Sequence, residues 1–274
     1  MSLLESILLG LLQGITEFLP ISSSGHIVIA QALMGEISQS ITFELIVHGG
    51  TLGSIVIYFY DDLLKMVNTA WQMVISPIAS YKNWENDYTL RLNVFILISM
   101  IPAAVAGFTI RDQIENVFAN PIGVSSMFIV TGTFLYGTNF FGQGKKTLNS
   151  GNILIVGLAQ AFSLLPGISR SGATISMAVF LGINRDDIAR FTFLMMLPVV
   201  AGAMLVEAIE VSKVGVQYDM IYQYILGFTT ALISGYYALK YLIRLFKSKG
   251  IHYFAYYCWA FGLTGLIYFG FILD

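Results

Sequence analysis

The sequence of 274 residues contains few charged side chains. Asp, Glu, Lys and Arg make up 11% of it and hydrophobic residues 56%, whereas ordinary soluble domains are about 25% charged. The mean hydropathy is +0.75, and several runs approach the roughly 20 apolar residues that a membrane-spanning helix needs. Because helices satisfy their own backbone hydrogen bonds in lipid, the composition excludes an ordinary soluble domain and predicts an all-α integral membrane protein.

Cysteine and net positive charge are also scarce. The single cysteine, Cys258, excludes an internal disulfide and a cysteine-based zinc site. The net charge of −2 and the lack of a large basic face argue against a nucleic-acid partner. The apolar N-terminus lacks the basic start of a signal peptide, so we interpret it as part of the mature protein. We expect one membrane domain over residues 1–274.

Two apolar segments, residues 3–34 and 152–182, are interrupted by polar tips. The first tip lies between Pro20 and Gly25, and the second runs from Pro166 to Thr174. Proline and glycine break a helix, so each segment is better described as two short helices than as one continuous span. We therefore predict two re-entrant helical hairpins whose tips lie inside the membrane.

The remaining apolar runs predict about six transmembrane helices, at residues 41–60, 91–110, 121–141, 188–208, 219–243 and 251–273. Basic residues mark cytoplasmic loops, and four of them lie at the end of the fifth span and in the loop after it: Lys240, Arg244, Lys247 and Lys249. Counting spans back from this loop places Lys145 and Lys146 inside and both termini outside. The second hairpin must then enter and leave from the cytoplasmic side.

The two hairpins also share a pattern that predicts an internal repeat. At one constant offset, Gln13 and Gly25 correspond to Gln160 and Gly172, and the motif that starts at Ser22 aligns with the one that starts at Ser169. Each half, approximately residues 1–141 and 152–274, has one hairpin and three spans, and a short cytoplasmic link joins the halves. An odd number of spans inverts the second copy, so the tips should meet near the midplane.

The residues at the tips suit a phosphate ligand. Arg170 supplies positive charge, the serines supply hydroxyls, and a helix that starts near Ser171 adds backbone N–H groups and the positive end of its dipole. A nucleophile, an acid or base and a positive charge are the parts that phosphoryl transfer needs. The predicted pocket collects nine residues: Glu17, Ser22, Ser23, Ser24, His26, Ser169, Arg170, Ser171 and Thr174.

Structural alternatives stay open for each of these residues. For Arg170 the alternative is a Gly/Pro kink from which the side chain reaches the interface or pairs with a distant acid. For Glu17 it is an ion pair with Arg170 that only pins the hairpins. His26 could instead be a core histidine with satisfied hydrogen bonds, and the serines could simply cap helices. Gln13 stands where a second carboxylate would have suggested a metal clamp, so we expect no metal held by the protein. An alternating-access transporter also combines inverted repeats with broken helices.

The two long motifs resemble those of a known family. Residues 13–26, QGITEFLPISSSGH, resemble the (E/Q)xxxE and SS-x-GH region of the undecaprenyl-diphosphate phosphatases of the bacitracin-resistance type, and residues 166–174, PGISRSGAT, are similar to that family's PGxSRSGxT signature. The resemblance implies the catalytic residues Glu17, Ser23, His26 and Arg170. The substrate-binding residues that we expect are Gln13, Ser22, Ser24, Gly25, Ser169, Ser171, Gly172 and Thr174.

The resemblance further implies a hydrolase in the plasma membrane that removes the terminal phosphate from a polyprenyl diphosphate lipid. Its site would open to the outer face, and a divalent cation, Mg²⁺ or Ca²⁺, would arrive with the diphosphate and not with the protein. Ser23, His26 or a water molecule would attack phosphorus, and the sequence leaves this choice open; Glu17 would orient or deprotonate the nucleophile. A homodimer and a combined role in lipid flipping are open alternatives.

Overall fold

The computed structural model describes residues 1–34, 41–215, 217–248 and 250–271. Within these ranges the chain is helical, and its only β-type pairing is an isolated bridge between Lys146 and Ile183. The α-helices are α1 (Leu3–Phe18), α2 (Ser23–Met34), α3 (Ile41–Tyr58), α4 (Tyr60–Ile75), α5 (Pro77–Lys82), α6 (Tyr88–Thr109), α7 (Arg111–Phe118), α8 (Pro121–Gly137), α9 (Ser150–Phe162), α10 (Arg170–Phe180), α11 (Arg185–Val214), α12 (Ile221–Ser248) and α13 (Phe254–Phe271).

Four of these helices, α3, α6, α11 and α13, are long and apolar enough to cross a membrane, which confirms a multi-pass helical membrane protein. The predicted spans at 121–141 and 219–243 correspond to α8 and α12, which fall outside this set. Helix α8 has 17 residues, and α12 carries several polar and tyrosine side chains among its apolar ones. Lys249 and the end of the predicted span 251–273 lie outside the described residues.

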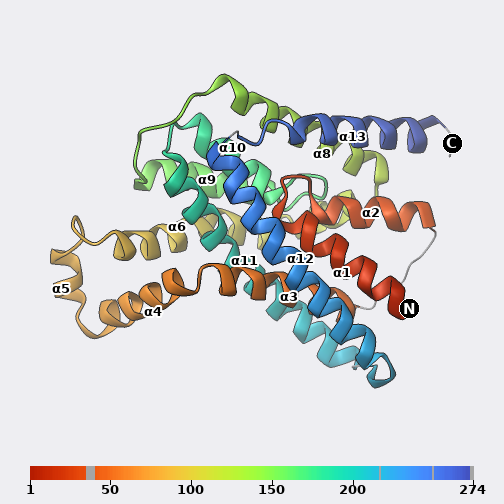
Figure 1. Ribbon diagram of the computed structural model, residues 1–274, viewed down its shortest axis with the longest axis horizontal. Coiled ribbons are helices and arrows are strands. Elements are labelled where there is room, and N and C mark those ends of the chain that lie inside the picture. The colour runs from red at the N-terminus through yellow and green to blue at the C-terminus, as the bar shows by residue number, and fades with distance from the viewer. Residues whose placement is uncertain (35–40, 216, 249, 272–274) are drawn as a thin grey trace.

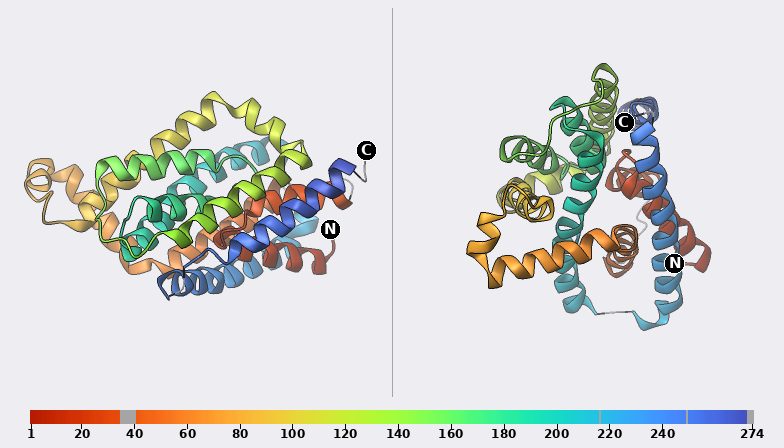
Figure 2. Two further views of the ribbon diagram at one scale, coloured as in Figure 1. Left: turned by 90° about the horizontal axis from the view of Figure 1, so that it is seen from above. Right: turned by 60° about the vertical axis from the view of Figure 1, so that its left-hand side comes forward.

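The two hairpins approach from opposite ends of α12. At the beginning of α12, Gln223 donates a hydrogen bond to the carbonyl oxygen of Met1, where the first hairpin starts. Near its other end, the carbonyl oxygen of Phe246 accepts from Arg185, which follows the second hairpin directly. A helix of 28 residues is about 42 Å long, so the start of the first hairpin and the end of the second lie far apart, at opposite ends of α12. Both described chain ends lie at one end of the molecule (Figures 1 and 2).

Small residues allow α12 to pack closely between α1 and α3. A Cβ atom at Gly10 of α1 would lie 2.1 Å from the Thr230 hydroxyl and 2.5 Å from the Gly227 carbonyl oxygen, and one at Gly50 of α3 would lie 2.6 Å from the Phe228 carbonyl oxygen. Membrane helices gain most of their association from such close packing, because lipid removes the hydrophobic driving force between them. The packing holds the first hairpin beside the long helices.

Helices α4 and α5, together with the start of α6, form an arm that projects from the other helices (Figures 1 and 2). Helix α4 follows α3 after the single residue Phe59, and neither α4 nor α5 contains a buried residue. Sequence reasoning gave no sign of the short α7 that follows α6. The arm lies apart from the two polar tips.

Candidate active site

The first tip begins where α1 ends at Phe18 and the backbone of Leu19 becomes extended. Ser22 has a φ of 65°, a left-handed conformation that is uncommon outside glycine, and its hydroxyl accepts a hydrogen bond from the Gly25 N–H at 3.3 Å. This bond satisfies one of the free N–H groups at the start of a helix. Ser22 therefore caps α2, which starts at Ser23 within the predicted tip.

The second tip repeats this cap. The Ser169 hydroxyl accepts from the Gly172 N–H at 3.1 Å, three residues on, and α10 starts at Arg170. Thr131 of α8 holds the tip from the side, because its hydroxyl donates to the Gly167 carbonyl at 2.8 Å and accepts from the Ser169 N–H at 3.1 Å. The aligned serines of the two motifs thus perform the same local task.

The tips touch each other. The Gly167 N–H donates to the Ser22 hydroxyl at 3.1 Å, across a sequence separation of 145 residues. A Cβ atom at Gly25 would lie 2.8 Å from the Gly167 Cα and 2.7 Å from the Phe128 ring, so only glycine permits this approach without displacement. The predicted convergence of the two motifs is confirmed.

A buried carboxylate lies at the junction. The Ser23 hydroxyl donates to Glu17 Oε2 at 2.6 Å, and the Gln13 side-chain amide donates to the same oxygen at 3.1 Å. Arg170 Nη1 is 3.8 Å from the other oxygen, Oε1, and the Glu17 side chain is only 6% exposed. A nucleophile bonded to a base, with a third group orienting that base, is the arrangement that activates a hydroxyl.

Two buried polar atoms beside this carboxylate have no hydrogen-bond partner within the described part of the chain. They are Nη1 of Arg170 and Oε1 of Gln13. Buried polar atoms in native proteins are nearly always paired, so such atoms at one site indicate groups arranged for a ligand. The 3.8 Å separation leaves Arg170 only loosely paired with Glu17.

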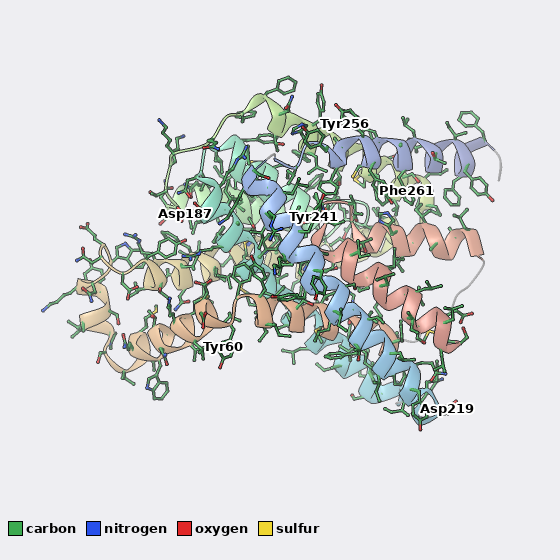
Figure 3. The ribbon with its side chains drawn as sticks, viewed as in Figure 1. Tyr60, Asp187, Asp219, Tyr241, Tyr256 and Phe261 are labelled. Carbon is green, nitrogen blue, oxygen red and sulfur yellow. The ribbon has the colours of Figure 1, made fainter. Side chains whose placement is uncertain are left out.

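His26 lies on α2, and its ring is bonded to the first tip on one side and to α13 on the other. Its Nδ1 lies 2.7 Å from the Ser22 carbonyl oxygen, and its Nε2 lies 2.5 Å from the hydroxyl of Tyr257 on α13. Phe128 meets the His26 ring edge-on, and Phe261 stacks against it with centroids 4.6 Å apart; Figure 3 shows Phe261 leaving α13 on the side toward α2. The hydrogen bonds of His26 go to Ser22 and Tyr257 and not to Ser23.

The other predicted substrate contacts have partners within the chain. Ser24 lies 3.5 Å from the Ser22 hydroxyl, Ser171 lies 3.2 Å from the Ser169 hydroxyl, and Thr174 donates to the Arg170 carbonyl at 2.8 Å. The N–H groups of Gly25 and Gly172 bond the capping serines. All of these residues lie in or directly behind the two tips, and their contact with a substrate stays a prediction.

Three residues that hold the tips were not found by sequence reasoning. They are Thr131 and Tyr257, described above, and Cys258, whose thiol donates to the Pro20 carbonyl at 3.7 Å. They lie in apolar helices outside both motifs, so no motif pointed to them. Among the residues that the structure describes, no group of three His, Cys, Asp or Glu side chains is arranged to hold a metal ion.

The fold and the site together define a multi-pass membrane protein with a buried hydroxyl–carboxylate–guanidinium site between two helical hairpins. The chain belongs to the family described as "Bacitracin resistance protein BacA", which it matches over residues 6–264. Similar proteins include the undecaprenyl-diphosphatase of Desulforapulum autotrophicum, 37% identical over 97% of this chain and 98% of the relative. The undecaprenyl-diphosphatase of Salinibacter ruber is 38% identical over 96% and 97%.

Proposed function

We propose that this protein is an undecaprenyl-diphosphatase, which hydrolyses the diphosphate of a polyprenyl carrier lipid to the monophosphate and inorganic phosphate. This reaction returns the carrier to cell-wall synthesis, and by lowering the diphosphate pool it confers bacitracin resistance. The observation that carries the proposal is the bond from Ser23 to Glu17 with Arg170 at the other carboxylate oxygen. Relatives of the same length named for this activity support it.

In the first step, the Ser23 oxygen attacks the terminal phosphorus while Glu17 accepts the hydroxyl proton. The bond from phosphorus to the bridging oxygen breaks, so the lipid monophosphate leaves and a phosphoserine remains. Arg170 and the first N–H groups of α2 and α10 stabilise the charge on the phosphoryl oxygens. In the second step, water attacks the phosphoserine and gives a proton to His26, the bond from phosphorus to the Ser23 oxygen breaks, and Glu17 returns its proton to that oxygen as phosphate leaves.

The contacts of His26 favour Ser23 as the nucleophile. Both ring nitrogens of His26 have partners, Ser22 and Tyr257, whereas the Ser23 hydroxyl is bonded directly to a carboxylate. His26 then assists as a base that accepts the proton of the attacking water in the second step. Trapping the phosphoenzyme and mapping it by mass spectrometry tests this assignment. A phosphohistidine at His26 contradicts it, and a phosphoserine at Ser23 supports it.

We further infer a plasma-membrane protein with six spans, two re-entrant hairpins and inverted repeats over approximately residues 1–141 and 152–274. The opposite entry of the hairpins along α12 and the equal caps at Ser22 and Ser169 support this architecture. The basic residues at the end of α12 favour a cytoplasmic location for that end. We infer that the site opens to the outer face of the membrane. The divalent cation is bound to the diphosphate of the substrate and not to the protein.

The decisive experiment is phosphate release by purified protein in detergent. A detergent micelle has no second compartment, so an enzyme releases phosphate from a polyprenyl diphosphate there and a transporter does not. Arg170→Ala and Glu17→Ala must each abolish most of the release. If both variants keep the full rate, this site is not the site of hydrolysis.

A further inference from the structure

The hydrogen bonds of His26 determine where its ring proton lies. A backbone carbonyl oxygen only accepts hydrogen bonds, so Nδ1, at 2.7 Å from the Ser22 carbonyl, must carry a hydrogen. In the neutral ring Nε2 then has the free lone pair. The Tyr257 hydroxyl, 2.5 Å away, is therefore the donor in its bond to Nε2.

Aromatic rings enclose this pair. The Tyr257 and His26 rings stack with their centroids 5.7 Å apart and an angle of 12° between their planes. Phe261 stacks on His26 from the same helix, and Phe128 of α8 meets it edge-on. His26 is 7% exposed, so the hydroxyl of Tyr257 is its one side-chain hydrogen-bond partner among the described residues.

Helix α13 is fixed firmly enough to set this geometry. A Cβ atom at Gly262 would lie 2.7 Å from the Ser125 carbonyl oxygen of α8, and one at Gly265 would lie 2.3 Å from the Ser125 hydroxyl, so α13 and α8 are in close contact. Cys258, the next residue after Tyr257, reaches the Pro20 carbonyl in the first tip. The position of Tyr257 relative to the first tip is thus determined by packing on both sides.

We propose that Tyr257 is a positioning residue for His26 in the reaction proposed above. Its hydroxyl holds the basic Nε2 nitrogen and selects the Nδ1–H form of the ring. The orientation of the imidazole therefore depends on a residue 231 positions away in the sequence. This inference rests on the proposed function for the role of His26 in catalysis, but the bond itself is independent of that function.

The contact is tested first without any activity measurement. The chain contains three histidines, His26, His48 and His252, so ¹⁵N-histidine labelling of the whole protein gives a small set of ring signals. His48→Gln and His252→Gln variants assign the remaining signals to His26. The expected result is a His26 ring with hydrogen on Nδ1 and a strongly hydrogen-bonded Nε2. A ring with hydrogen on Nε2 and a bare Nδ1 overturns the inference in the unmodified chain, where folding is not in question.

Tyr257→Phe then removes only the hydroxyl and keeps the stacked ring. The matched control is Tyr256→Phe, on the adjacent residue, whose ring is 55% exposed and which leaves α13 on a different side from Phe261 (Figure 3). In Tyr257→Phe the Nε2 signal should move toward that of a free lone pair. In Tyr256→Phe all His26 signals should stay in place. An unmoved Nε2 signal in Tyr257→Phe contradicts the proposal.

Kinetics separate positioning from a general loss of structure. Tyr257→Phe should lower kcat about three- to tenfold, the worth of one hydrogen bond. It should leave KM within about twofold, because the hydroxyl bonds His26 and is not among the groups proposed to bind the phosphate. Tyr256→Phe should change neither constant. An equal kcat in Tyr257→Phe refutes the positioning role. If the unmodified protein releases no phosphate, the proposed function fails together with the catalytic role, while the NMR result still decides the Tyr257–His26 bond.

Discussion

Replacing Glu17 by Gln tests the central contact of the site. Glutamine keeps the size of the side chain and one oxygen that can accept from Ser23, but it cannot take up the proton. General-base catalysis contributes roughly 10² to 10⁴ in rate, which is about 3 to 5 kcal/mol at about 1.4 kcal/mol per factor of ten. The Ser23–Glu17 distance of 2.6 Å is typical of a strong bond to a charged acceptor. We therefore expect kcat to fall at least 100-fold.

The assay is phosphate release from a polyprenyl diphosphate in detergent, with kcat and KM measured separately. Glu5→Gln is the matched control, because Glu5 lies on the same helix at an exposed position and caps its start. Glutamine serves at that capping position as well as glutamate. Glu5→Gln should leave the rate unchanged, and both variants should elute from gel filtration like the unmodified protein.

A double-mutant comparison decides whether Glu17 acts through Ser23. Residues that work as one unit have strongly non-additive effects, so Glu17→Gln should cost little further rate in a chain that already carries Ser23→Ala. If the two losses multiply instead, Glu17 does not act through Ser23. A loss of less than threefold in Glu17→Gln alone would refute the role of the carboxylate as base.

Three further changes test the rest of the site. Arg170→Ala should lower kcat/KM about 10² to 10³-fold, as expected for one lost charge-stabilising donor. Arg170→Lys should restore part of this loss, because lysine keeps the charge without the forked geometry. Equal rates in the unmodified protein and both variants would contradict the role of Arg170 in binding the phosphoryl oxygens. Gly25→Ala should destabilise the fold by about 1 to 3 kcal/mol and lower the unfolding temperature, because the new Cβ would lie 2.8 Å from the Gly167 backbone. The control Gly107→Ala should leave the unfolding temperature unchanged, because a Cβ there meets nothing within 4 Å. Calorimetric titration of the protein alone with Mg²⁺ or Ca²⁺ should show no tight binding, whereas the same cations should affect turnover of the diphosphate. Stoichiometric binding to the protein with a micromolar Kd would contradict the proposal that the cation arrives with the substrate.

The helical hairpins were predictable because their signals are local. Proline, glycine and serine in an apolar run interrupt a helix whatever surrounds them, and the helices begin and end within a few residues of the predicted tips. The number of membrane-spanning helices was harder to predict from the sequence. Helix α8 is shorter than the four helices that are long and apolar enough to span a membrane, and α12 carries more polar side chains than α3 or α13.

The convergence of Glu17 with Arg170 was also predictable, but only through the repeat. Two motifs at a constant offset, separated by an odd number of spans, predict that their tips meet, and the bond between Gly167 and Ser22 confirms it. The sequence did not predict which serines cap a helix and which one bonds the carboxylate. Ser22 and Ser169 cap helices while Ser23 bonds the carboxylate. The two caps form on different backbones, left-handed at Ser22 and extended at Ser169, so no single local conformation marks them.

The sequence alone determined that this is a helical membrane protein and which two motifs are candidates for its chemistry, since burial of charge and hydroxyls in lipid is costly wherever it occurs. Only the tertiary structure decided what each polar group bonds. The partner of His26 is a tyrosine in an otherwise apolar helix near the other end of the chain. Which single hydroxyl reaches an imidazole depends on the rotation and close packing of α13 against α8 and the first tip, and no local pattern encodes that rotation.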